Sequence, residues 1–204
     1  MKKRLVLMGT VLAVVLLAAF PGRAVYREYR FRQALAEQTV NAATNTEHIS
    51  VCLQCMCDLI DHAMEMETEQ ERRTSLSALS SWAQDCADSL GKMESYFRLY
   101  SQMKDDSYIG KFSTGNFEVR DRCLKLSAYL LPYVTGAEDE RDPEFQELLL
   151  QCKQDLLWLD GLWQEVFSAS LTGKEWIAAY HGLFYDREPE FNRFFIAVCQ
   201  ATES

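Results

Sequence analysis

The sequence predicts an all-α protein in which an N-terminal membrane anchor helix precedes an antiparallel four-helix bundle with a short helical C-terminal cap. The 204 residues include only 4 Pro and 9 Gly, too few turn residues for an all-β fold. Apolar residues recur at steps of three and four along four long segments, as in helices that bury one face. We expect an anchor (or signal peptide) over residues 1–23, the bundle over 24–170 and the cap over 171–204.

The charge of the chain argues against nucleic-acid binding. The formal net charge is −9, and the first 24 residues hold four of the 21 basic residues and no acidic one. The remaining 180 residues therefore carry 17 basic and 30 acidic side chains. Such a surface repels phosphate backbones, and no basic stripe interleaved with aromatic residues compensates for it. We expect no nucleic-acid partner.

The first segment has the composition of a membrane helix. Three basic residues precede 16 uncharged ones, Leu5 to Phe20, and Pro21 with Gly22 ends the run. This length lies between the core of a signal peptide and the roughly 20 apolar residues of a full span. The basic flank that follows favours an uncleaved anchor, with cleavage after Ala24 as the alternative. We expect a single-pass membrane protein with its domain on the extracytoplasmic side.

A long helix is predicted from Ala24 to about Glu67, because this segment contains no Pro or Gly. Its second half carries a regular apolar stripe that would pack in the bundle. The charged run METEQERR then interrupts the stripe, and we expect a turn there. The stripe consists of Ile49, Cys52, Met56, Leu59, Ala63 and Met66.

The second bundle helix is predicted over residues 74–103, where the same three and four spacing continues around Trp82. After it, KDDSYIGKFSTGN is the longest irregular stretch and contains two glycines as turn residues. Binding residues concentrate in loops, and Tyr108, Ile109 and Phe112 give this loop apolar side chains that a partner protein can bury.

The third helix is predicted from about Asn116 to Thr135. Gly136 is a suitable residue just past its C-terminus. Pro132 should kink the helix or end it early, because proline lacks the backbone N–H that a helix interior needs.

The fourth helix, over residues 142–166, has the most regular stripe in the chain. Asp142 is a good N-cap residue, and Pro143 occupies the first helical position, where proline is favoured. A stripe of this kind is stable only against partner helices with the same period, so the four helices together predict an antiparallel bundle.

The C-terminal segment is rich in aromatic residues. Thr172 and Glu175 have the spacing of a capping box, which begins a short helix carrying Trp176 and Tyr180 on one face. Pro189 opens a last helix with several phenylalanines. We expect a lid packed on the end of the bundle; a docking surface for a partner is the alternative.

The seven cysteines are candidates for metal binding. His48, Cys52, Cys55 and His62 share one helical face, and Cys86 is placed to reach them from the next helix. Cysteines at stripe positions more often serve as small hydrophobic residues, and an odd number argues against a disulfide framework. The metal site therefore stays a secondary hypothesis, and we expect no cofactor.

No catalytic signature is present. The sequence lacks the nucleophile elbow G-x-S-x-G, the zinc motif H-E-x-x-H, a phosphate loop and a dinucleotide fingerprint. Hydrolysis by two carboxylates stays open, since any of the 30 acidic residues could pair in space. We expect a protein that is not an enzyme.

Three short stretches resemble the N-terminal helical domain of the YpeB family of bacterial germination proteins. They are LSALSSWAQDCADSLGKM around Trp82, IGKFS from Ile109 to Ser113, and DPEFQELLLQCKQDL around Phe145. Family members continue into repeated PepSY-type domains, whereas this sequence ends at Ser204, so it resembles a stand-alone N-terminal half. The resemblance implies a spore inner-membrane protein that stabilises and localises a cortex-lytic cell-wall hydrolase until germination.

These observations lead us to expect a membrane-anchored helical bundle that binds a partner protein through Tyr108, Ile109, Phe112, Trp176 and Tyr180. Its acidic surface would steer a basic partner, and the anchor would confine both proteins to one surface. An extracytoplasmic small-ligand sensor or a metal-binding bundle is the alternative. Self-association along the helix stripes is left open.

Overall fold

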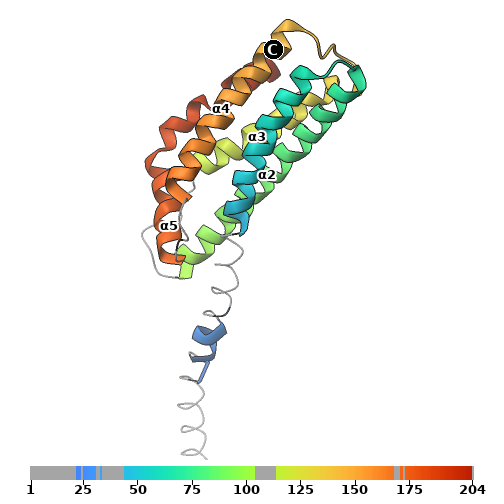
Figure 1. Ribbon diagram of the computed structural model, residues 1–204. Coiled ribbons are helices and arrows are strands. Elements are labelled where there is room, and N and C mark those ends of the chain that lie inside the picture. Colours follow the sequence, from blue (N-terminus) through green and yellow to red (C-terminus); the bar gives the residue numbers. More distant parts are fainter. Residues whose placement is uncertain are drawn as a thin grey trace, which may run out of the picture. The chain divides into compact units, whose positions relative to one another are not determined.

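The structure is a computed structural model that describes residues 22–23, 25–30, 33, 44–103, 114–167, 171 and 173–203 (Figure 1). Contacts divide the chain into two compact units, residues 1–40 and 41–204. In the second unit, the described residues form helices joined by turns, with no strand among them, so the all-α prediction is confirmed. The elements are the first helix (residues 44–65), α2 (Glu69–Met103), α3 (Thr114–Thr135), α4 (Pro143–Phe167), α5 (Gly173–His181), the π-helix η1 (Gly182–Asp186), the 3₁₀ helix η2 (Glu188–Arg193) and α6 (Ile196–Glu203).

The first helix and α4 pack side by side and run in opposite directions. Near the start of the first helix, the Thr46 carbonyl accepts a hydrogen bond of 3.1 Å from the Trp163 indole near the end of α4. Near its end, Asp61 pairs with Lys153 in the middle of α4. As residue numbers rise in one helix they fall in the other, which is the antiparallel arrangement.

The pair of α2 and α3 and the pair of the first helix and α2 are also antiparallel. Between α2 and α3, the Ser80 and Ser127 hydroxyls lie 2.7 Å apart, and Arg73 at the start of α2 lies against Gly136 just past the end of α3. Between the first helix and α2, the His62 ring is hydrogen-bonded to Ser75 across the turn. The packed helices form a bundle whose core contains the stripes predicted from the sequence.

Two helix boundaries follow the predicted capping chemistry. Asp142 Oδ1 accepts the Glu144 amide at 3.2 Å, with Pro143 at the first helical position. At the end of α3, Gly136 has a φ of +76°, a backbone conformation that glycine adopts without steric cost. Pro132 does not end α3 early, since the helix continues to Thr135.

The C-terminal segment does more than cover one end of the bundle. α5 packs on α4, whereas η2 and α6 return along α3 and α4 (Figure 1). Arg122 of α3 donates to the carbonyls of Phe191 and Phe194, and Asp155 of α4 accepts the Phe195 amide at 2.7 Å. Arg122 and Asp155 thus fix the backbone of the turn between η2 and α6 against α3 and α4.

The helix predicted to open at Pro189 is in fact two elements. The 3₁₀ helix η2 ends at Arg193, and α6 begins only at Ile196. Between them Phe195 has a φ of 50°, which an L-residue with a large side chain rarely adopts. This turn lets Phe191, Phe194 and Phe195 all enter the core, where each is fully buried.

The predicted localisation requires a correction. In the described part of the chain, no helix is both long enough and apolar enough to cross a membrane. The expectation of a single-pass membrane protein with an extracytoplasmic domain is therefore not supported, and we do not retain it. The run from Leu5 to Phe20 that led to this expectation lies outside the described residues.

Candidate protein-binding surface

Three of the five predicted partner-binding residues, Tyr108, Ile109 and Phe112, lie outside the described residues. The other two, Trp176 and Tyr180, lie in the core, because α5 turns both rings inward. The two rings stack at 5.2 Å, and the Trp176 indole donates to Thr46 Oγ1 at 3.0 Å. The Tyr180 hydroxyl donates to Glu94. Such buried and hydrogen-bonded rings stabilise the fold and present no surface to a partner.

The predicted metal-binding face is occupied by other contacts. The His48 ring packs on Trp82 with centroids 6.0 Å apart, and His62 bonds Ser75 at 2.9 Å. Cys55 is only partly buried, whereas Cys52 is fully buried. Among the described residues, no three His, Cys, Asp or Glu side chains are placed to hold a metal ion.

Three thiols of the core form a row across the first helix, α2 and α3. Cys86 is hydrogen-bonded to Cys52 on one side and to Cys123 on the other, so the expectation that Cys86 reaches the first helix is confirmed. The hydrogen bond with Cys86 and burial raise the pKa of the Cys52 thiol far above its usual value. All three side chains are fully buried and act as small hydrophobic residues.

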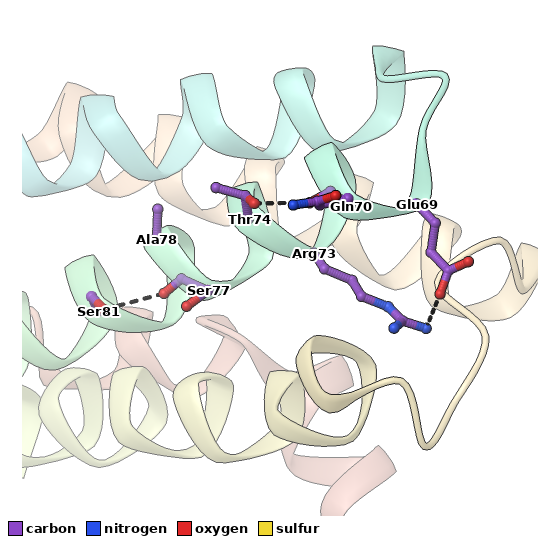
Figure 2. Close-up of a pocket in the computed structure, with 7 residues that line it drawn as sticks. All are labelled: Glu69, Gln70, Arg73, Thr74, Ser77, Ala78 and Ser81. Carbon is purple, nitrogen blue, oxygen red and sulfur yellow. Dashed lines mark hydrogen bonds and ion pairs between the residues drawn. The ribbon is translucent and has the colours of Figure 1, made fainter.

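Three recesses described in the structure open at its surface. The recess in Figure 2, of about 780 Å³, is a furrow lined only by α2 residues: Glu69, Gln70, Arg73, Thr74, Ser77, Ala78 and Ser81. A second, of about 430 Å³, lies where Asp155 and Trp158 of α4 meet Pro189 and Arg193. A third, of about 460 Å³, lies at the connection between α3 and α4. None of these three lies between the bundle helices, where a sensor would hold a small ligand.

The two adjacent helices that carry the strongest charge are the first helix and α4. The first helix contains four carboxylates (Glu47, Asp58, Asp61 and Glu65) and no Lys or Arg. α4 contains five carboxylates (Glu144, Glu147, Asp155, Asp160 and Glu165) and one basic residue, Lys153. The pair of helices therefore presents a negative potential, which attracts basic segments of other proteins.

A salt bridge marks the centre of this surface. Lys153 Nζ lies 2.5 and 2.6 Å from the two carboxylate oxygens of Asp61, and this hydrogen bonding raises the pKa of the Lys153 ammonium. Asp58 and Glu65 lie one turn to either side of Asp61 on the first helix. The bridge thus leaves both flanking carboxylates, which are exposed, to interact with another molecule.

Apolar side chains flank the same salt bridge on α4. Leu150 and Leu157, one turn before and one turn after Lys153, are 45% and 54% exposed. We call the surface made by Asp58, Asp61, Glu65, Leu150, Lys153 and Leu157 the acidic face. It combines an apolar pair with carboxylates, a pattern that suits the binding of an amphipathic basic helix.

The acidic face was not predicted from the sequence, although a signal for it was present. Leu150 and Leu157 each follow a stripe residue, Leu149 and Leu156, and only one stripe can face the core. A second apolar stripe with a seven-residue repeat therefore indicates an exposed surface.

A second exposed stripe lies on α3. Phe117, Leu124 and Leu131 repeat every seven residues and are 64%, 41% and 60% exposed, and the smaller Ala128 lies on the same exposed face. We call these four residues the α3 ridge. Unlike the acidic face, the α3 ridge lies on a helix whose charges nearly balance. α3 carries two acidic residues (Glu118 and Asp121) and three basic ones (Arg120, Arg122 and Lys125).

Comparisons with protein-family models, with characterised proteins and with solved structures give no match. The resemblance to the YpeB family is therefore untested, and it stays a prediction from the three short motifs.

Proposed function

We propose that this protein is a non-enzymatic helical bundle that binds a basic segment of a partner protein on the acidic face. The observation that carries the proposal is the placement of two exposed leucines beside carboxylates on two adjacent helices. Charged residues alone would attract any cation, and leucines alone would attract any apolar surface. Together they select a segment that is both apolar and basic.

The spacing of the apolar pair fits an amphipathic helix. Leu150 and Leu157 are two turns apart on α4, or about 10 Å along its axis. A partner helix with apolar residues at the same seven-residue spacing buries them, while its lysines or arginines pair with Asp58 and Glu65. The salt bridge between Asp61 and Lys153 keeps the centre of the face neutral, so the positive charge of the partner is placed toward the two ends.

The identity of the partner is proposed from the resemblance alone. A cortex-lytic cell-wall hydrolase would be held by this face and kept stable until germination. The absence of any catalytic signature in the sequence agrees with a binding role.

Photo-crosslinking tests the proposal directly. A benzophenone amino acid at Leu150, in the full chain expressed in sporulating cells, should give one adduct, identified by mass spectrometry as a cortex-lytic hydrolase. The matched control carries the probe at Ile196, which is 49% exposed and lies on α6. An adduct with the hydrolase at Leu150 but not at Ile196 supports the proposal. Equal adducts at both positions, or none at Leu150, contradict it.

Salt dependence provides a second readout of the same contact. Asp58→Asn with Glu65→Gln removes two charges without changing side-chain size, so hydrolase crosslinking at Leu150 should decrease and become less sensitive to salt. Unchanged crosslinking in the double variant would show that the carboxylates do not contribute.

A further inference from the structure

We propose that the α3 ridge is the contact surface for a second copy of this chain, with the two α3 helices antiparallel and the two Leu124 side chains meeting at the twofold axis. This interaction goes beyond the proposed function because it uses another helix and another partner. Three features of α3 and its surroundings point to a second copy: the symmetry of the ridge, its charges and its shape.

The ridge is symmetric about its centre. Phe117 and Leu131 lie seven residues before and seven residues after Leu124, so the ridge extends about 21 Å along α3. When two copies pair antiparallel about Leu124, Phe117 of each copy lies opposite Leu131 of the other. A twofold interface requires such a self-complementary surface, in which each contact occurs twice.

The charges of α3 also match themselves under this rotation. Asp121 and Lys125 form a salt bridge of 3.1 Å within one copy. In the antiparallel pair, Asp121 of one copy and Lys125 of the other are offset by two residues, about 3 Å along the axis. Opposite charges therefore approach across the interface. The twofold rotation repeats this contact between Lys125 of the first copy and Asp121 of the second. The acidic face cannot pair in this way, because two copies of it would bring carboxylates together.

The shape beside the ridge completes the match. The α2 furrow shown in Figure 2 is lined by the short side chains of Thr74, Ser77, Ala78 and Ser81 and, toward the start of α2, by the longer Glu69, Gln70 and Arg73. α3 runs alongside it. The neighbouring contacts of Arg73 with Gly136 and of Ser80 with Ser127 place Ser77 beside the level of Leu131. Phe117 of the second copy, opposite Leu131, therefore meets the furrow. Phe117, the largest side chain of the α3 ridge, lies at one end of the ridge, and the furrow lies beside the other end. A twofold rotation therefore brings Phe117 of each copy to the furrow of the other copy.

Sedimentation equilibrium of the full chain tests the dimer, over concentrations on the order of 1–100 µM, since a contact of this size binds weakly. Leu124→Asp should weaken dimerisation by about a hundredfold, because both copies lose a central leucine and each loss costs about tenfold. Val51→Asp, at a position of similar exposure on the first helix, should leave the dimer intact. A native chain that stays monomeric at the highest concentration would overturn the proposal.

Cysteine crosslinking tests the register and does not depend on destabilising substitutions. In a chain with Cys55→Ser and Cys199→Ser, which removes the two partly exposed thiols, Leu124→Cys should give a disulfide-linked dimer. A chain with Phe117→Cys should crosslink to a chain with Leu131→Cys, whereas neither should crosslink to itself. Crosslinking of Val51→Cys at the same rate as Leu124→Cys would show random collision and would overturn the register.

The two proposals fail separately. A Leu124→Asp chain that is monomeric yet still crosslinks to the hydrolase at Leu150 supports both. A native chain that is monomeric contradicts the dimer but not the binding role of the acidic face. A missing hydrolase adduct contradicts that binding role but not the dimer.

Discussion

Arg72 and Glu140 form a buried ion pair that ties the beginning of α2 to the connection between α3 and α4. The guanidinium lies 3.2 Å from the carboxylate, and both side chains are almost fully buried. Arg72 also donates to the carbonyls of Met66 and Glu67, at 2.8 and 2.9 Å, in the turn after the first helix. One side chain thus joins two connections at the same end of the bundle.

The first prediction concerns this ion pair. Arg72→Met should lower the free energy of unfolding by about 3 kcal/mol, because it removes the nearer of the two cations that pair with the buried Glu140 carboxylate and leaves only Arg73, whose Nε lies 3.7 Å away. Urea unfolding followed by circular dichroism measures the change. Lys92→Met, at an exposed position of α2, should change stability by less than about 0.5 kcal/mol. A small effect of Arg72→Met would mean that Arg73 alone is enough to stabilise the buried Glu140 carboxylate.

A second prediction compares two glycines. Gly136→Ala should destabilise the protein by about 1–2 kcal/mol, since its φ of +76° is unfavourable for alanine. Gly161→Ala should instead stabilise it by about 0.5–1 kcal/mol, because Gly161 is inside α4 and a Cβ there meets no atom within 4 Å. Thermal unfolding of the two variants should show opposite shifts in Tm, and shifts of the same sign would contradict the backbone argument.

Asp155 gives a prediction for pH dependence. Burial raises the pKa of this carboxyl above 3.8, although the Phe195 amide and the nearby Arg122 charge oppose the shift. The folded state therefore holds the proton more tightly than the unfolded state does. The contribution of Asp155 to stability is greatest below pH 3.8 and is lost as the pH rises through the folded pKa.

The measurement is a series of urea titrations across that pH range. Asp155→Asn keeps an oxygen that can accept the Phe195 amide but removes the ionisation. Its stability relative to the native chain should rise with pH and then level off. A constant difference between the two proteins would show that Asp155 titrates normally in the folded state.

The cysteines provide a prediction about chemical reactivity. Cys55 and Cys199 are partly exposed and should react with iodoacetamide in the folded protein, whereas the five buried thiols should not. Burial raises the pKa of Cys57 to about 11, so even slight exposure leaves it mostly protonated. Mass spectrometry should find two labelled sites under native conditions and seven in urea. Rapid labelling of Cys86 would contradict the buried row of thiols.

Local signals in the sequence predicted most of the fold. Asp142, Pro143 and Gly136 act at helix ends through interactions with their near neighbours, so their roles could be predicted without any tertiary information. The expectation of an early end to α3 at Pro132 was wrong for a related reason. Pro132 lies in the last turn of α3, where the loss of one hydrogen bond and a local distortion are tolerated.

The surfaces were harder to predict, because burial depends on which face of a helix its neighbours cover. Trp176 and Tyr180 lie on one face of α5, but the sequence does not state whether that face meets the bundle or the solvent. Leu150 and Leu157 present the converse case, since each directly follows a residue of the core stripe and the sequence did not lead us to single them out. Only the packing of the first helix against α4 shows that they are exposed.

The attachment of η2 and α6 to α3 and α4 has a consequence for the order of folding. Arg122 bonds Phe191 across 69 residues of chain, whereas Ser80 and Ser127 of the α2 and α3 pair are 47 residues apart. Contacts between residues that are farther apart in the sequence form later, because the intervening chain must first be ordered. We therefore expect a folding intermediate in which α2 and α3 have paired but the strip of α3 that later contacts Phe191 and Phe194 is still bare. Aggregation during refolding should begin from that strip.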